Sequence, residues 1–264
     1  MIFLSKNGED EYVNMFAEGC KTPITHSETF KFRHSNDPIV LRGIMKHKVM
    51  KECWTVGRHF YYIDSGYFGN QKSPQNPQGW KYWHRIVKND IQHGNVIIDR
   101  PGDRWSQFNI PLEPWKKGGS KILIAAPDEK PCIFYGITKE QWITETIDTL
   151  KQHTDRPIEV RERSPNRIDR IQNNTLKEAL DDNVFALVTF NSNAATEAIM
   201  YGYPAFAMSP THAAAPVALN DLSKIETPLY ADNRYEWACH LAYGQFHVNE
   251  LKSGMAMKIL QGEI

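Results

Sequence analysis

The sequence lacks the features that mark most membrane, secreted and zinc-binding proteins. Its 264 residues include only four cysteines, at Cys20, Cys53, Cys132 and Cys239, and no C-x-x-C pair. This spacing favours neither a disulfide framework nor a zinc site, and it indicates a reducing compartment. No apolar run reaches the length of a membrane helix, and residues 1–6 turn polar too early for a signal peptide. We therefore expect a cytoplasmic protein with no membrane span.

Several nucleotide-binding and catalytic motifs are also missing. The sequence has no G-x-x-x-x-G-K-[ST] loop and no G-x-G-x-x-G turn, which argues against a P-loop hydrolase and a standard nicotinamide dehydrogenase. It has no G-x-S-x-G nucleophile turn and no H-E-x-x-H pair either. The ten histidines are scattered, so we expect no metal site.

The net charge of the sequence is zero, but the net charges of its two halves have opposite signs. Residues 1–120 hold 17 Lys and Arg against 12 Asp and Glu, whereas the remainder holds 14 against 19. Opposite signs favour two domains and suggest that the first half meets an anionic partner. A solvated basic face explains the bias equally well.

Apolar runs alternate with helix-forming segments, which predicts an α/β protein with parallel sheets and helices on both faces. The expected strands are 2–5, 38–44, 58–69, 82–87, 121–125, 157–161, 185–190 and 205–208, with a weaker one at 96–98. The expected helices are 9–18, 46–56, 139–154, 175–181 and 194–201, with 235–260 largely helical. Residues 111–120 are rich in Pro, Gly and Lys and are typical of a linker. We therefore expect two domains, 1–115 and 120–264.

The most informative stretch is 184–204, where an apolar run ends in Asn191-Ser192-Asn193 and a helix-forming segment runs to Gly202-Tyr203-Pro204. A helix that begins after a strand presents unpaired backbone N–H groups and suits a phosphate. The alternative is an ordinary strand-to-helix crossover, with one of the three polar residues as the helix N-cap.

The second half places polar turns after each of its four expected strands. The carboxyl ends of parallel strands share one edge, where ligands bind, and Arg side chains and backbone amides suit a diphosphate there. The Glu197 carboxylate either accepts a hydrogen bond from a hydroxyl of the sugar or the ribose, or it only complements the helix dipole. The predicted donor-binding residues are Arg161, Arg163, Arg167, Asn191, Ser192, Asn193, Ala194, Ala195, Glu197 and Ser209.

Asp64 is the best candidate for a catalytic base in the first half, because it ends an aromatic strand beside Ser65-Gly66. It is equally well explained as an acid that caps a turn, and Asp90 is the second choice. Aromatics interleaved with cations can stack on bases, or they form a core edged by long cations. The predicted acceptor-binding residues are Ser65, Tyr67, Arg85, Asn89, Asp90, Arg104 and Trp105.

Residues 189–198, followed by Gly202-Tyr203-Pro204, resemble the donor-domain signature of GT-B glycosyltransferases. The branch that includes capsule-polysaccharide sugar transferases has a similar F-N-S-x-x-x-x-E-A…G-x-P. Residues 61–68, with Arg85 and 99–105, are similar to compact bacteriophage sugar transferases, some of which modify DNA. The sequence departs from the family pattern at Ala205, because a second glutamate is usual eight residues after the position of Glu197.

The resemblance implies two Rossmann-like domains facing across a cleft, an acceptor-binding domain at 1–115 and a nucleotide-sugar-binding domain at 120–264. It places the donor phosphates near Ser192, Asn193 and Ala194, a ribose or sugar contact near Glu197, and the acceptor-side base at Asp64. The expected co-substrate is a nucleotide diphosphate sugar, with no metal and no tightly bound cofactor. The compartment would be the host cytoplasm if a phage encodes the protein.

The preferred acceptor is a hydroxymethylated pyrimidine of phage DNA, such as hydroxymethylcytosine, because the first half is basic. A capsule or lipopolysaccharide sugar is the nearest alternative acceptor. Two other classes remain open: a sugar-nucleotide epimerase of the same architecture, and a non-catalytic nucleic-acid-binding protein.

Overall fold

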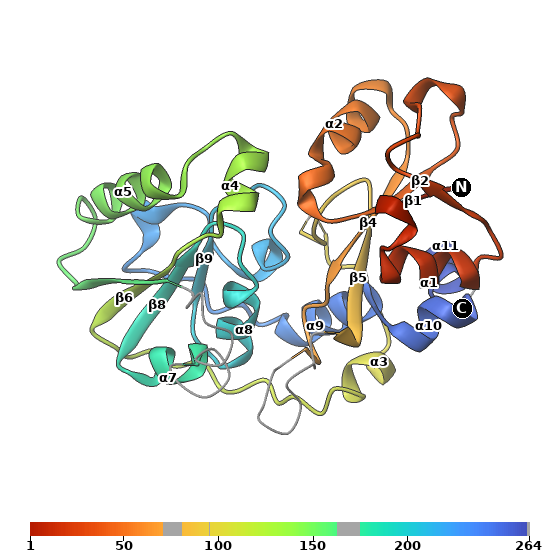
Figure 1. Cartoon of the computed structure of the whole chain (residues 1–264). Coiled ribbons are helices and arrows are strands. Elements are labelled where there is room, and N and C mark those ends of the chain that lie inside the picture. The colour runs from red at the N-terminus through yellow and green to blue at the C-terminus, as the bar shows by residue number, and fades with distance from the viewer. Residues whose placement is uncertain (71–80, 95, 163–174, 263–264) are drawn as a thin grey trace. The chain divides into compact units, whose positions relative to one another are not determined.

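The strands form two separate sheets, each with its own hydrophobic core. The computed structural model describes residues 1–70, 81–94, 96–162 and 175–262 (Figure 1). Its described residues divide into two compact units. Unit 1 comprises 1–70, 81–93 and 241–262, and unit 2 comprises the described part of 94–240.

Unit 1 contains a six-stranded sheet in the order β10-β5-β4-β3-β1-β2. Strands β2, β1, β3 and β4 are parallel, whereas β5 is antiparallel to both β4 and β10. The bounds are β1 Ile2–Ser5, β2 Ile24–His26, β3 Ile39–Arg42, β4 Phe60–Ser65, β5 Trp83–Lys88 and β10 Gln245–His247.

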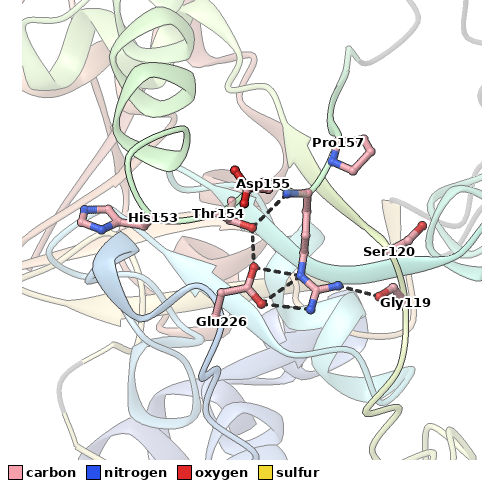
Figure 2. Close-up of a pocket in the computed structure, with 8 residues that line it drawn as sticks. Gly119, Ser120, His153, Thr154, Asp155, Pro157 and Glu226 are labelled. Atoms are coloured by element: carbon pink, nitrogen blue, oxygen red, sulfur yellow. Dashed lines mark hydrogen bonds and ion pairs between the residues drawn. The ribbon is translucent and has the colours of Figure 1, made fainter.

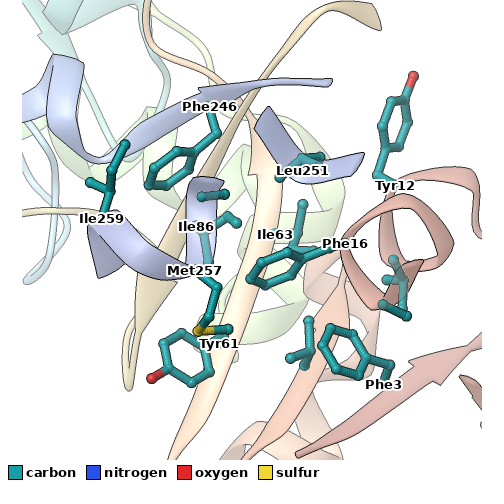
Figure 3. Close-up of a cluster of buried hydrophobic side chains, with 14 residues drawn as sticks. Phe3, Tyr12, Phe16, Tyr61, Ile63, Ile86, Phe246, Leu251, Met257 and Ile259 are labelled. Atoms are coloured by element: carbon teal, nitrogen blue, oxygen red, sulfur yellow. The ribbon is translucent and has the colours of Figure 1, made fainter. Parts of the chain in front are cut away.

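Helices cover both faces of this sheet because its strands bury alternate side chains on opposite sides. One face carries the core of Figure 3, where Phe3, Ile63 and Phe246 from the strands meet Phe16 of α1 (Glu11–Gly19). Helices α10 (Val248–Ser253) and α11 (Met255–Gln261) complete that core. On the other face, Trp54 of α2 (His47–Val56) contacts Phe60 edge-on at 5.5 Å between ring centroids.

Unit 2 contains a fully parallel sheet in the order β7-β6-β8-β9, formed by β6 Lys121–Ala125, β7 Ile158–Arg161, β8 Val184–Thr189 and β9 Ala205–Ala207. Trp142 and Leu150 of α5 (Lys139–Leu150) pack on one face, and α8 (Ala194–Met200) lies against β8 and β9. The described part of unit 2 also contains α3 Asp103–Ser106, α4 Glu129–Tyr135 and α7 Leu176–Asp181, and α9 Arg234–Tyr243 begins in it and ends in unit 1. The parallel strands have the same spatial order in both units. Numbered along the chain within each unit, the strands lie side by side in the order second, first, third, fourth.

The expected α/β class is confirmed, and so is the parallel sheet of the second half. The expectation of parallel strands throughout is wrong for unit 1, where β5 runs back along β4. A parallel neighbour needs a crossover connection, usually a helix, and no helix-forming segment lies between β4 and β5 in the sequence.

One local expectation is also wrong: residues 96–98 form no strand, and Val96 and Ile98 are exposed. The stretch 235–260 is largely helical, as expected, in α9, α10 and α11, although β10 interrupts it and buries Phe246. Three residues are too few for a hydrophobic period to separate strand from helix.

The units differ from the expected domains at both boundaries. Unit 2 begins at Gly94, and residues from Leu241 onward belong to unit 1. The expected linker at 111–120 lies within unit 2, where Glu113 N–H donates to Met200 O at 2.9 Å and Lys116 N–H donates to Gly202 O at 2.8 Å. Within the described residues, no helix is long and apolar enough to span a membrane.

Candidate functional site

The four strands of unit 2 end along one edge of its sheet, as the sequence predicts. The last residue of β6, Ala125, pairs with Arg161 of β7 and with Thr189 of β8, and Thr189 pairs with Ala207 of β9. The strand order reverses between β6 and β8, which is where open α/β sheets bind ligands. The Thr189 hydroxyl joins these two strand ends by donating to Ala125 O at 2.9 Å.

The turns after β8 and β9 are held together by hydrogen bonds. Ser209 N–H donates to Phe190 O at 2.9 Å. His212 lies 2.9 Å from Ser192 O through Nε2, and Ala214 N–H donates to its Nδ1 at 2.9 Å. A carbonyl accepts and an amide donates, so these partners require the neutral imidazole with its proton on Nε2. His212, which is fully buried, therefore fixes the position of the Ser192 turn.

The first amides of α8 already have partners inside the turn. Ala194 N–H donates to Ser192 Oγ at 3.2 Å, and Ala195 N–H donates to Ser192 O at 3.3 Å. Glu197 N–H donates to Asn193 O at 3.0 Å. The N-cap residue is Asn193, which makes no side-chain capping bond, so Ser192 holds the first two amides in its place, and a phosphate at these amides would have to replace its bonds.

Three hydroxyl groups in this region are buried without a hydrogen-bond partner. They are Ser209 Oγ, Thr196 Oγ1 and Thr211 Oγ1, and only 2% of Ser209 is exposed. Buried polar groups are almost always bonded, so these hydroxyls have unused capacity to donate a hydrogen bond. The sequence pointed to Ser209 but missed both threonines, although Thr196 lies within the family-like segment and Thr211 follows Ser209 by two residues.

The remaining predicted donor residues are placed as follows. Arg161 ends β7 at the predicted edge of the sheet. Asn191 and Asn193 in the turn after β8, and Glu197 in the first turn of α8, are half-buried. Arg163 and Arg167 lie outside the described residues.

Gly202, in the family-like Gly-x-Pro, has a structural role that predicts a large effect of substitution. Its φ is +78°, and an added Cβ would lie 2.1 Å from Pro114 O. We expect Gly202→Ala to destabilise unit 2 by about 3 kcal/mol, from backbone strain and this clash. Urea unfolding measures the loss. The matched control is Gly136→Ala, whose φ is +74° with nothing within 4 Å of the added Cβ, and it should cost about 1 kcal/mol. Equal losses in the two variants would contradict the clash.

In unit 1, Asp64 is held by three donors at the carboxyl end of β4. Its Oδ1 accepts from Ser65 N–H at 2.8 Å, and its Oδ2 accepts from the Tyr62 hydroxyl at 2.6 Å and from Arg85 at 3.1 Å. Burial favours a higher pKa for Asp64, but Arg85 and the Tyr62 hydroxyl outweigh it and hold the pKa below its usual value. The carboxylate is therefore ionised at neutral pH, and 36% of its side chain is exposed.

Arg85 gathers Ser65 and Tyr67 around Asp64. Besides its ion pair with Asp64, it donates to Ser65 O at 2.8 Å and to Ile91 O at 3.1 Å, and its guanidinium lies 5.3 Å from the centre of the Tyr67 ring. With its donors used in this way, Arg85 is suited to positioning Asp64 and less suited to binding an acceptor.

Tyr67 is buried, with its hydroxyl accepting from His93 N–H at 3.0 Å. Its backbone N–H donates to Gln245 Oε1 at 2.6 Å. Burial raises the pKa of Tyr67 to about 12. Tyr67 therefore supports the loop after β4 and presents no exposed ring to an acceptor.

Asn89 does not lie with Asp64. It follows β5 and exchanges hydrogen bonds with Phe60 at the first residue of β4, with N–O distances of 2.8 and 3.1 Å, whereas Asp64 lies near the end of that strand. Its φ of +60° suits an asparagine in a turn. Asp90 accepts from the N–H of its neighbour Ile91 at 2.7 Å, which is a turn contact and gives no support to a role as the base.

Arg104 and Trp105 belong to α3 in unit 2, whereas Asp64 belongs to unit 1. Both are buried. A buried ring cannot stack on a base from solution, so the structure supports the core interpretation of these two residues.

A hollow of about 520 Å³ lies at the opposite edge of the unit 2 sheet, where β6 and β7 begin. Arg156 lines it and donates to both carboxylate oxygens of Glu226 and to Gly119 O. Figure 2 shows Glu226 and Gly119 among the lining residues. Its guanidinium also lies 3.7 Å from the centre of the Phe185 ring. Each of the three guanidinium nitrogens of Arg156 therefore already has a protein partner.

Metal ligands and relatives give no further indication of function. In the part of the chain that the structure describes, no three His, Cys, Asp or Glu side chains are grouped as a metal site. No protein-family model matches the sequence, and no curated protein matches it either. The resemblance to GT-B glycosyltransferases remains a prediction from the motif residues.

Proposed function

We propose that this protein is a glycosyltransferase that moves a sugar from a nucleotide diphosphate donor to a hydroxyl acceptor. The observation that carries the proposal is the edge of unit 2, where buried hydroxyls without partners adjoin the point at which the strand order reverses. Unit 2 would hold the donor, and unit 1 would supply the acceptor site and Asp64.

The donor site is proposed at the turns after β8 and β9. Ser209 and Thr196 carry buried hydroxyls that lack acceptors, and phosphate oxygens accept such hydrogen bonds. Asn191 and Asn193 add half-buried amide side chains. Because Ser192 already engages the first amides of α8, the hydroxyls are the better candidates for the first phosphate contacts.

In the proposed reaction the acceptor oxygen bonds to the anomeric carbon as the bond from that carbon to the diphosphate oxygen breaks. Asp64 takes the hydroxyl proton, and the diphosphate leaves with the electron pair of the broken bond. The leaving group carries charge, so hydrogen bonds from unit 2 should stabilise it in the transition state. An acid is not required to protonate it.

A thermal-shift panel of uridine, guanosine, cytidine and thymidine diphosphate sugars tests the proposal. A ligand that binds only the folded protein at 100 times its Kd adds about 2.7 kcal/mol of stability, which should raise Tm by about 5 °C or more. Absence of a shift with every donor would reject nucleotide-sugar binding.

The Ser209→Ala variant makes this test specific to the proposed site. Removing an unsatisfied buried hydroxyl should leave the Tm of the free protein unchanged or higher, while the shift caused by the donor should fall. Ser106→Ala, at an exposed position of unit 2, is the control and should retain the full shift. A Ser209→Ala protein with an undiminished shift would place the donor elsewhere.

For the acceptor we propose a hydroxymethylated pyrimidine in DNA. The support is electrostatic, since the described residues of unit 1 contain 14 Lys and Arg against 10 Asp and Glu. Incubation with a radiolabelled donor and either hydroxymethylcytosine DNA or a polysaccharide acceptor distinguishes the two. Label in the polysaccharide alone would favour a capsule or lipopolysaccharide transferase, and an epimerised sugar without acceptor would indicate an epimerase.

A further inference from the structure

Unit 1 has its own point of strand-order reversal, between β1 and β3. The ends of these strands are Ser5 and Arg42. Ligands bind at such points in open α/β sheets, and none of the residues assigned above lies there.

Arg42 is a partly buried cation whose guanidinium has no hydrogen bond to any described residue. Its Nε is buried without a partner, its side chain is 31% exposed, and its guanidinium lies 4.6 Å from the centre of the Tyr12 ring. The closest carboxylate oxygen, Asp10 Oδ2, is 3.9 Å away, which is too far for a hydrogen bond. A buried N–H group without a hydrogen bond is costly, and an anion that accepts from Nε would relieve that cost.

Asp10 neutralises this region only in part. Its carboxylate also caps α1 by accepting from Val13 N–H at 3.3 Å. The nearby acid Asp64 is paired with Arg85. Glu28 and Lys6 also act on Lys46, so two carboxylates, Asp10 and Glu28, face the three cations Arg42, Lys46 and Lys6.

Lys46 adds donors beside Arg42. Its Nζ donates to Leu4 O at 2.9 Å in β1, and an ammonium has two further N–H groups. Burial lowers the pKa of Lys46, while Asp10 opposes that change. A bound anion would stabilise the charged form.

The backbone between the two cations leaves space for a ligand. Gly43 has φ of +86°, and a Cβ added to it would meet nothing within 4 Å. Arg42 and Lys46 flank this open position in the sequence, at the turn from β3 toward α2.

We propose that Arg42 and Lys46 bind a phosphate group at the edge of unit 1. The guanidinium fork can donate two parallel hydrogen bonds to phosphate oxygens, and the ammonium contributes a point charge. The group is either a phosphodiester of a polynucleotide or the phosphate of a small ester. This site does not depend on sugar transfer; if the chain is a transferase, the phosphate belongs to the acceptor.

Titration of ¹⁵N-labelled full-length protein with inorganic phosphate tests the site through the Gly43 amide resonance. We expect a saturable shift of this resonance in the parent protein. The affinity for phosphate should be weaker by about tenfold or more in both Arg42→Gln and Lys46→Gln, because each variant loses a charged hydrogen bond. Lys48→Gln is the matched control on an exposed position of α2 and should bind as the parent does. Loss of the Gly43 response only in the two site variants supports the proposal.

Two further arms identify the source of the phosphate. A hexathymidylate that binds at least about tenfold more tightly than thymidine monophosphate, with a strong salt dependence, supports a polynucleotide, and the reverse order supports a small ester. No saturable shift at Gly43, or an unchanged affinity in Arg42→Gln, would overturn the site. A response at Ser209 without one at Gly43 rejects this inference and leaves the donor proposal intact, whereas the opposite pattern rejects only the donor site.

Discussion

Replacing Asp64 with asparagine is expected to lower the rate of sugar transfer by about 10²–10⁴-fold, the usual contribution of a general base. Asparagine keeps the size of the side chain but cannot take a proton from the acceptor. Because the donor phosphates are proposed to bind in unit 2, the thermal shift caused by the nucleotide-sugar should persist. Transfer of labelled sugar at saturating donor measures the rate.

The control must separate loss of the base from loss of structure. Asp64→Asn also leaves Arg85 without its anion. This loss should lower the free energy of unfolding by only about 1 kcal/mol, because the carboxylate is partly exposed. Tyr62→Phe removes the 2.6 Å hydrogen bond to Asp64 but keeps the carboxylate, so its transfer rate should stay within about tenfold of the parent. If Asp64→Asn transfers sugar as fast as the parent, Asp64 is not the base.

Acidification should destabilise both units between pH 6.5 and pH 4. Burial, as the largest cause, lowers the pKa of His84 in unit 1 and of His240 in unit 2 from 6.5 to about 4. Below pH 6.5 the unfolded chain takes up a proton that the folded protein does not bind until about pH 4. Stability is thus fully present above pH 6.5 and falls by about 3 kcal/mol for each histidine as the pH reaches 4.

The surroundings of His84 in the structure explain why its pKa is lowered. Its Nε2 lies 3.2 Å from Lys81 O, its Nδ1 is buried without a partner, and its ring lies 3.7 Å from that of Tyr12 between centroids. Protonation would place an unpaired N–H in this buried position.

The measurement is urea unfolding at about pH 7 and about pH 4.5, with amide hydrogen exchange in β4 and β8 to follow each unit. His84→Phe preserves the ring contact but does not titrate. It should remove most of the pH dependence in β4 and leave that of β8 unchanged. A parent protein equally stable at both pH values would contradict the burial of neutral histidines.

Much of the local structure could be predicted from the sequence because it depends on short-range patterns. Asp10 caps α1, Gly57 ends α2 with a φ of +69°, and Thr175 forms a capping box with Glu178 in α7. The shared edge of the unit 2 strands follows from their alternation with helices.

The candidate site was predictable only where its residues are close in the sequence. Asn191, Ser192 and Asn193 share one turn, and Asp64 and Ser65 share another. Arg42 and Lys46 escaped prediction, because an arginine after a strand looks like any surface cation until its partners are known. The same limit applies to Thr196, whose missing hydrogen-bond partner is a property of packing.

The sequence by itself determined the α/β class, the parallel sheet of unit 2, and the turns that end its strands. These depend on hydrophobic period, capping and chain direction, all of which are local. Only the tertiary structure decided that β10 joins the sheet of unit 1, that Arg104 and Trp105 belong to unit 2, and that Asn89 lies away from Asp64. The physical reason is that pairing and burial depend on segments distant in the chain: Phe246 pairs with His84 from 162 positions away.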